Sequence, residues 1–198
     1  MSFRNKYITL KLFIILVSLT GVMYPLLMSL IGQSLFNYQA NGSLYQNKDS
    51  IIGSYLIGQN FKSDKYFHPR PSYAGNGYEA NNSSSSSFAL TNKKFKEIVK
   101  TKYNKLIKNG KYLDIASDEV FASASGLDPY ISLNNAYNQL DRIAKIRGIR
   151  HSKLQEIINN HKEVTFFGII GNPRINVLVL NIYLDNYISF KDKNKSEQ

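Results

Sequence analysis

At 198 residues, the chain has room for one membrane segment and one domain, and its 43% hydrophobic residues are enough to build a core. The absence of cysteine excludes disulfides, Cys-containing zinc sites, iron–sulfur clusters and thiol nucleophiles. Lysine and arginine (25) exceed aspartate and glutamate (14), and the resulting net charge of +11 has to be located along the chain before it is interpreted.

The first predicted element is a membrane-spanning helix over residues 12–33. No charged residue occurs between Leu12 and Asn47, and residues 12–31 are overwhelmingly apolar. Roughly 20 residues at about 1.5 Å each cross a hydrocarbon core of about 30 Å. Gly21 and Pro25 lie inside the stretch. Because lipid-embedded helices tolerate both residue types, Pro25 predicts a kink and no break.

The charges before this helix predict its orientation. Arg4, Lys6 and Lys11 precede it without an acidic residue, so residues 1–11 should be cytoplasmic and the rest extracytoplasmic, in a single-pass plasma-membrane protein. A cleaved signal peptide is the alternative, but it has a shorter apolar region and a small-x-small site, and Tyr38 occupies one of the small positions here. A pilin-type assembly helix would carry an early acidic residue, which this stretch lacks.

We expect one extracytoplasmic domain over residues 41–190. The polar residues 39–43 favour a turn at its start. Residues 51–67 alternate apolar clusters with Gly53 and Gly58, which suggests short strands or turns. The two prolines in 68–71 then require an extended path, and the serine- and glycine-rich residues 72–87 predict a loop.

Three helices should follow the loop. The first is capped by Thr91, carries apolar residues at helical spacing up to Ile107 and ends near Gly110. The second runs from its cap Ser132 to Gly148, and the third covers residues 152–161. The other face of the first helix concentrates basic charge against Glu97 alone: Lys93, Lys94, Lys96, Lys100, Lys102, Lys105 and Lys108.

Two strands are predicted after these helices, over residues 164–170 and 175–184, joined by a turn at 171–173. The second is apolar on both faces, which is typical of a central strand covered by helices. The charged residues 191–198 have no apolar periodicity, so we expect a disordered tail. The predicted fold class is therefore α+β, with one transmembrane helix before a single mixed domain.

The lysine-rich helix first suggests nucleic acid as a partner. A location outside the membrane argues against that, and no aromatic pair interleaves with the lysines to form a stacking platform. A solvated helix surface, or a contact with acidic lipid headgroups or a partner protein, fits better.

The phrase at 122–129 (ASASGLDP) places serines beside a carboxylate, as a hydrolase would. A nucleophile elbow needs glycine two residues before the serine, however, and Ser123 stands there before Ser125. His68, His151 and His161 are scattered, and no phosphate-binding glycine loop occurs. We therefore expect a tight loop in which Asp128 and Ser132 accept backbone N–H bonds, and no catalytic, metal or cofactor site.

Nine segments in this order make the chain similar to the C subunit of the Kdp-type potassium-transporting ATPases, the KdpC family. They are 24–27 (YPLL), 39–44 (QANGSL), 53–54 with 56–61 (LIGQNF), 66–72 (YFHPRPS), 91–92, 122–128 (ASASGLD), Gln139 with 142–144 and Arg147, 171–177 (GNPRINV), and 180–181 with 184–185. Where the family usually has glycines, the chain has Ser83 to Ser87, so Ser84 and Ser85 should either take another path or accept strain of about 1 kcal/mol each.

The resemblance implies an accessory subunit that is needed for assembly and activity of an ATP-driven potassium importer. Its partners would be a P-type ATPase subunit, a channel-like subunit and possibly a small membrane subunit, which would handle ATP, magnesium and potassium. The domain would lie outside, beside the potassium entrance. Any effect on nucleotide affinity would then have to pass through the anchor helix or the partners.

Ten residues in these segments are candidates for partner contact, and a role in maintaining the domain's own loops remains equally open for them: His68, Pro69, Arg70, Ser72, Ser123, Ser125, Gly126, Asp128, Gln139 and Arg142. Two other functions also stay open, a stand-alone membrane-anchored hydrolase and an independent surface-binding module.

Overall fold

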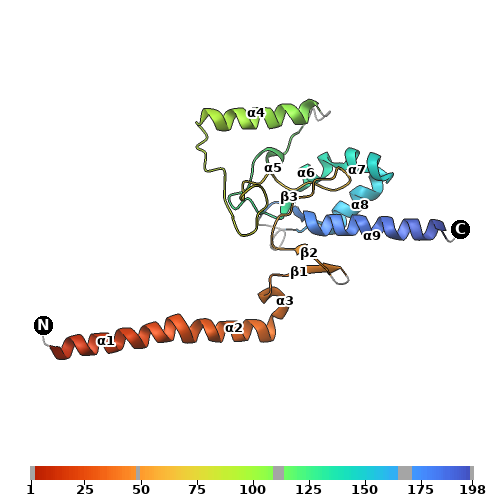
Figure 1. Cartoon of the computed structure of the whole chain (residues 1–198). Helices are drawn as coiled ribbons and strands as arrows, with labels where there is room; N and C mark the ends of the chain where they lie inside the picture. The colour runs from red at the N-terminus through yellow and green to blue at the C-terminus, as the bar shows by residue number, and fades with distance from the viewer. Residues whose placement is uncertain (1–2, 48–49, 109–113, 165–170, 197–198) are drawn as a thin grey trace. The chain divides into compact units, whose positions relative to one another are not determined.

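The computed structural model describes residues 3–47, 50–108, 114–164 and 171–196 (Figure 1). The chain divides into two compact units, Met1–Ile52 and Gly53–Gln198. The first contains the apolar helix and the second contains the mixed domain.

The apolar N-terminal segment is helical through α1 (Phe3–Ser18), the π-helical turn η1 (Leu19–Met23) and α2 (Tyr24–Leu35). From Asn5 to Leu35 it is 31 residues long, with mean hydropathy 2.2 in its most apolar window and none of that window buried. By length and composition it can cross a membrane, as the sequence predicts for 12–33. The π-helical turn ends two residues before Pro25, whose ring crowds the preceding turn and which lacks an N–H donor.

The exit from this helix is a turn, as predicted. Phe36 leaves helical geometry at φ −133° before the short α3 (Asn37–Ala40). The Asn41 amide then bonds back to Gln33 at 3.1 Å, and Gly42 and Ser43 take positive φ values of 86° and 46°. β1 (Leu44–Asn47) pairs with β2 (Ser50–Ser54) after this turn.

The core of the second unit is built from helices around a small antiparallel sheet. In chain order its elements are α4 (Lys93–Lys108), α5 (Ser117–Val120), β3 (Tyr130–Ser132), α6 (Leu133–Asn138), α7 (Leu140–Arg147), α8 (His151–His161), β4 (Arg174–Asn176) and α9 (Val177–Ser196). Ile131 of β3 lies opposite Ile175 of β4. Both join one buried cluster with apolar side chains of α6, α7, α8 and α9, and with Phe67 from the preceding loop.

The predicted helix ends are largely confirmed. Ser132 caps α6, because its Oγ accepts from Asn135 N at 3.1 Å, and Gly148 ends α7 with φ 60°. The expected single helix is divided at Gln139 into α6 and α7. The cap of α4 is Asn92, whose Oδ1 accepts from Phe95 N at 3.3 Å, and not Thr91. The expected stop at Gly110 lies outside the described residues.

The predicted strand at 175–184 is wrong. β4 covers only Arg174–Asn176, and the chain then continues as α9. The buried residues of this segment recur at helical spacing: Val177, Leu180, Asn181 and Leu184. In a strand, Asn181 would only interrupt the apolar pattern. Asn176 Oδ1 accepts from Leu178 N at 3.0 Å and starts the helix.

Two further predictions concern the ends of this region. In the strand predicted at 164–170, residues 165–170 lie outside the described part of the chain, while Glu163 forms a single bridge with Arg174. The tail expected to be disordered over 191–198 is helical as far as Ser196, where α9 ends. The loop predicted at 72–87 contains no helix or strand, as expected.

Candidate functional site: two polar clamps and a loop platform

The first polar clamp reaches from α7 to the backbone of the loop at residues 64–68. Gln139 is only 5% exposed, and its Oε1 accepts from His68 N at 2.7 Å while its Nε2 donates to His68 O at 3.1 Å. The amide also donates to Asn135 Oδ1 at 2.7 Å. Because Gln139 satisfies both backbone groups of His68, it fixes the path of the chain immediately before Pro69.

Arg142 extends this clamp by one helical turn. Its guanidinium donates to the carbonyls of Asp64 and Tyr66, the latter at 2.9 Å, and to Gln139 Oε1 at 2.7 Å. Burial lowers the pKa of Arg142, against the opposing effect of the Asp64 carboxylate. The structure thus places Gln139 and Arg142, both chosen from the sequence, in one network within the fold.

A second polar clamp reaches the same loop from α9. Asn181 is 2% exposed; its Oδ1 accepts from Phe67 N at 2.8 Å and its Nδ2 donates to Phe67 O at 3.0 Å. Asp185 accepts from Tyr66 OH at 2.8 Å and pairs with Arg147 at 2.8 Å. Burial, followed by the Asp185 carboxylate, raises the pKa of Tyr66.

Asn181, Asp185 and Arg147 are not among the predicted site residues, although all three lie in the segments that carry the family resemblance. A signal was present in the spacing, since Asn181 and Asp185 stand four residues apart on one helix face. If 177–184 is a helix, Asn181 lies among its buried apolar positions. A buried amide needs partners for both its donor and its acceptor, as the backbone of another segment can provide.

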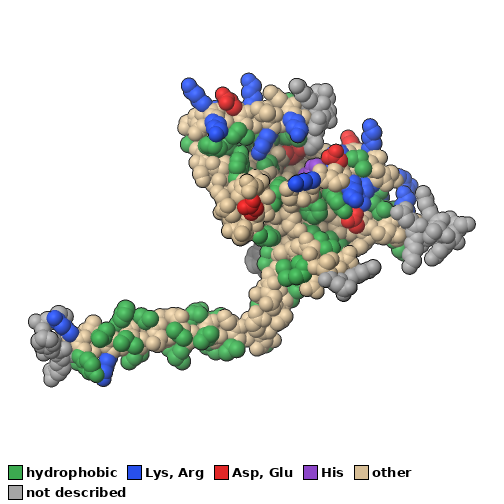
Figure 2. Space-filling view, viewed as in Figure 1, with side chains coloured by type: hydrophobic (Ala, Val, Ile, Leu, Met, Phe, Trp, Pro, Cys, Tyr) green, Lys and Arg blue, Asp and Glu red, His purple; other side chains and the backbone are tan. Residues whose placement is uncertain are grey.

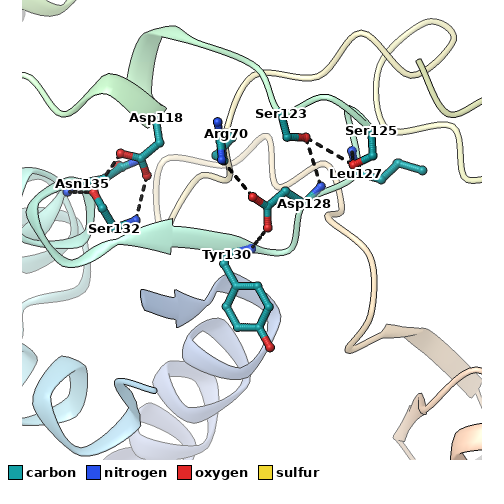
Figure 3. A network of polar contacts seen from close by, with 9 residues as sticks. All are labelled: Arg70, Asp118, Ser123, Ser125, Leu127, Asp128, Tyr130, Ser132 and Asn135. Atoms are coloured by element: carbon teal, nitrogen blue, oxygen red, sulfur yellow. Dashed lines mark hydrogen bonds and ion pairs between the residues drawn. The ribbon is translucent and has the colours of Figure 1, made fainter. Parts of the chain in front are cut away.

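The phrase at 122–129 forms the predicted tight loop (Figure 3). Asp128 Oδ1 accepts from Tyr130 N at 3.0 Å, and Ser125 Oγ accepts from Leu127 N at 3.1 Å. Ser123 Oγ lies 3.4 Å from both Asp128 N and Ser125 Oγ. The hydroxyls of both serines therefore hold the shape of their own loop.

An ion pair joins this loop to the proline-rich segment. Arg70 Nη1 lies 2.9 Å from Asp128 Oδ2, with 26% and 29% of the two side chains exposed (Figure 3). Ser72 Oγ accepts from the backbone nitrogens of Ala74 and Tyr78 at 3.1 and 2.9 Å. We call the partly exposed surface formed by residues 68–72, 123–125 and 128 the loop platform.

Gly126 is buried between Ser125 and Leu127, where the backbone of other loops comes close. Its φ is +68°, and a Cβ there would lie 2.6 Å from Ser84 O and 2.8 Å from Ala74 N. Ser84 N and Ser83 Oγ both bond Ser125 O, at 3.1 and 2.9 Å. The glycine thus allows three loops to approach one another.

For Ser84 and Ser85 the sequence left two outcomes open, a strained backbone or a different loop path. Positive φ occurs at Ser87, with a value of 51°, and neither at Ser84 nor at Ser85. Ser85 Oγ accepts from Ser87 N at 3.1 Å and supports that turn. The loop therefore takes a different path around Ser84 and Ser85.

Asp118 of α5 is a further buried polar group, and it bonds the start of α6. It is 8% exposed and accepts from Ser132 N and Ser132 Oγ, both at 2.8 Å, and from Asn135 Nδ2 at 3.0 Å (Figure 3). This carboxylate fixes the start of α6, from which the Gln139 clamp follows. No pattern around Asp118 in the sequence indicated this long-range contact.

The side chains of these networks contact one another and the backbone through hydrogen bonds and ion pairs. Within the described residues, no group of three or more His, Asp or Glu side chains could hold a metal ion. The three histidines occupy separate places: His151 lies 3.4 Å from Asp141, His161 contacts the Ile157 carbonyl at 2.8 Å, and His68 contacts the Ser63 carbonyl at 3.2 Å. Ser125 is exposed.

The family model described as "KdpC: K+-transporting ATPase, c chain" matches residues 7–186, which include the apolar helix, both polar clamps and the loop platform. The chain belongs to the KdpC family. This membership confirms the resemblance seen in the sequence segments. The chain is therefore a subunit of a potassium-transporting ATPase complex, and its apolar helix is consistent with a membrane location.

Curated relatives named "Potassium-transporting ATPase KdpC subunit" agree with this membership. The chain is 44% identical to the Rhodospirillum rubrum protein over 178 residues, covering 89% of this chain and 92% of the relative. Identity to the Koribacter versatilis protein is 38% over 182 residues, covering 92% and 94%. The Mycobacterium tuberculosis protein is 41% identical over 187 residues, covering 92% and 98%.

Proposed function

We propose that the chain is an accessory, non-catalytic subunit that the ATPase complex needs for its assembly and activity. The observation that carries this proposal is the KdpC match over residues 7–186, because this single match covers both the anchor helix and the clamped domain. The anchor supports it physically, because its apolar window has no buried position and can pack against lipid or partner helices.

The proposed orientation places residues 1–11 in the cytoplasm and the second unit outside the plasma membrane. Arg4, Lys6 and Lys11 support it through the positive-inside bias. A membrane-impermeant maleimide can test it because the chain has no cysteine of its own. Lys145→Cys on α7 should react in intact cells, and Asn5→Cys only after permeabilisation; the reverse pattern would contradict the orientation.

The proposed partners are a channel-like subunit, a P-type ATPase subunit and possibly a small membrane subunit. ATP, magnesium and potassium would be bound by these partners. Arg142, Gln139 and Gly126 would act on the partners indirectly, because their contacts hold loops within the domain.

Direct partner contact is proposed for the loop platform, where the remaining candidates gather: His68, Pro69, Arg70, Ser72, Ser123, Ser125 and Asp128. A steric test compares Ala124→Trp with Ala80→Trp, since both alanines are exposed but only Ala124 belongs to the loop platform. We expect Ala124→Trp to reduce recovery of the partner subunits during purification and Ala80→Trp to leave recovery unchanged. Equal recovery for both variants would remove the loop platform from the interface.

Deletion of the chain tests the proposed function itself. Cells that depend on this importer should fail to grow at limiting potassium without the chain and should recover when it is supplied. Gentle detergent extraction should recover the chain together with two larger partners. Normal growth without it, combined with extraction of the chain alone, would contradict the proposal and favour an independent surface-binding module.

A further inference from the structure

Helix α4 stands apart from the buried clusters of its own unit. None of its residues from Lys93 to Ile107 is fully buried. Its aromatic link to the rest of the unit is Phe95, whose ring centre lies 6.0 Å from that of Phe121 and 5.9 Å from that of Phe88. Lys102 lies over the Tyr73 ring at 5.4 Å, and its partial burial lowers its pKa.

An apolar groove of ≈ 400 Å³ lies between α4 and two residues outside the helix, Leu90 and Phe121. Three of its apolar lining residues are substantially exposed: Leu90 by 78%, Tyr103 by 46% and Phe121 by 38%. Phe95 and Val99 complete the apolar lining. Exposed side chains of this size, gathered in one place, indicate a surface that is covered by a partner.

Lysines border this groove. Lys96 and Lys100 line it directly, and Lys93 precedes Lys96 by three residues on the same helix face. Glu97 is the one acidic residue in the sequence of α4. Lysine side chains are visible across α4 in Figure 2, with hydrophobic surface between them.

The combination of an apolar groove with bordering lysines limits the classes of partner that fit it. Phosphates of a nucleic acid would satisfy the lysines but leave Leu90 and Val99 without an apolar partner. An anionic bilayer offers both parts of the complement, because lysines reach the headgroups while apolar side chains enter the headgroup–acyl boundary. The chain also carries a helix able to cross a membrane, which would keep the second unit at a high effective concentration near the bilayer.

We propose that the α4 groove is a docking surface for anionic phospholipid headgroups, through Lys93, Lys96 and Lys100 around the apolar lining. This surface would give the chain a second attachment to the bilayer besides the anchor helix. It goes beyond the proposed subunit role, since neither potassium transport nor partner binding requires it.

The experiment uses the full chain in nanodiscs, with a nitroxide label on a single introduced cysteine. Tyr103→Cys places the label beside the groove, and Ile146→Cys on α7, where the native side chain is 51% exposed, is the matched control. Discs contain phosphatidylcholine alone or together with phosphatidylglycerol. With phosphatidylglycerol, the label at 103 should become less accessible to a water-soluble nickel chelate and more accessible to oxygen, and the label at 146 should not change.

Charge neutralisation provides the second arm. Lys96→Gln with Lys100→Gln should weaken docking by about 25-fold, because each lysine near an anionic surface contributes about fivefold. The control pair, Lys62→Gln with Lys145→Gln, changes the net charge equally at other exposed positions and should leave docking unchanged. A salt titration of the labelled chain without lysine substitutions gives an independent readout, in which docking should weaken as salt rises.

Three results would overturn the proposal. The first is equal accessibility of the label at 103 in both lipid mixtures. The second is an equal effect of the two lysine pairs in variants that retain wild-type circular dichroism. The third is a label at 103 that is protected from the nickel chelate only when partner subunits copurify, even in discs of phosphatidylcholine alone. That result would assign the groove to an acidic protein surface.

Discussion

The clamped loop at residues 64–68 and helix α4 belong to the same unit, but they differ in whether their polar side chains are buried or exposed. Asn135, Gln139 and Asn181 are at most 5% exposed, and their amides bond other segments of the chain. In α4 five lysines are exposed and Lys102 is partly buried, and no residue from 93 to 107 is fully buried. Buried polar groups therefore determine the loop shape in the first region, whereas the charge on α4 remains available to bind another surface.

The two regions should therefore respond differently to mutation. Loss of a buried hydrogen-bond partner leaves its mate unsatisfied, which costs much more than loss of an exposed charge. The free energy of unfolding of the second unit, measured by denaturant titration of the full chain in nanodiscs, can separate them.

The largest effect is expected for Asn181→Ala. The substitution leaves both the N–H and the carbonyl of buried Phe67 without their present partner, so unfolding should require about 2–4 kcal/mol less free energy. Asn186→Ala, at an exposed position of the same helix, should change it by less than about 0.5 kcal/mol. Similar values for the two variants would refute the clamp from α9.

Gly126→Ala should rank next, with Gly148→Ala as its control. The two glycines have φ values of 68° and 60°, but a Cβ at 148 meets nothing within 4 Å. Gly148→Ala should therefore cost only the left-handed conformation, about 1 kcal/mol, and Gly126→Ala about 1–2 kcal/mol more because backbone atoms obstruct its Cβ. Equal costs would show that the three loops separate easily.

Alkaline pH should weaken the loop platform through Tyr78. Its hydroxyl donates to Arg70 O at 2.6 Å, and burial raises its pKa to about 12 from the model-compound value of 10.0. A raised folded-state pKa gives stability that is present below pH 10 and is lost as pH rises toward 12. This loss amounts to roughly 2–3 kcal/mol.

Tyr78→Phe provides the measurement for this pH effect. The variant should be less stable than wild type by about 1 kcal/mol near neutral pH, because it lacks the hydrogen bond to Arg70 O. It should also lack the Tyr78 part of the alkaline decline, so the difference should shrink and reverse between about pH 10 and about pH 12. Parallel pH profiles would contradict this role for Tyr78.

The smallest effect is expected on α4. Lys96→Gln with Lys100→Gln should change the unfolding free energy by less than about 0.5 kcal/mol, because both side chains are exposed. A loss comparable to that of Asn181→Ala would mean that α4 is part of the stability core and would remove the contrast between the two regions.

The sequence predicted those elements whose signals are local. The charge-free stretch predicted the apolar helix, and the Ser132 cap and Gly148 predicted the two ends of the α6–α7 region. It failed at 175–184, where β-branched and leucine side chains resemble a strand although their buried positions follow a helical period. The break at Gln139 was missed for another reason, since that side chain bonds His68, which is 71 residues away.

The candidate site divides in the same way. The tight loop at Asp128 was predictable because its hydrogen bonds join near neighbours. Gln139 and Arg142 were selected from the family resemblance, and nothing in their local spacing indicated the loop that they bind. Asp118 was missed because its partners lie 14 or more residues away along the chain. Asn181 was missed because residues 175–184 were predicted to form a strand, which hid the helical spacing of Asn181 and Asp185.

We propose that the chain is a required subunit of the ATPase and catalyses nothing itself. Potassium-stimulated ATP hydrolysis by the purified partner subunits, measured with and without this chain, tests that claim most directly. We predict little activity without the chain, restored activity when it is co-expressed, and no hydrolysis by the chain alone. Full potassium-stimulated activity in its absence would contradict the account.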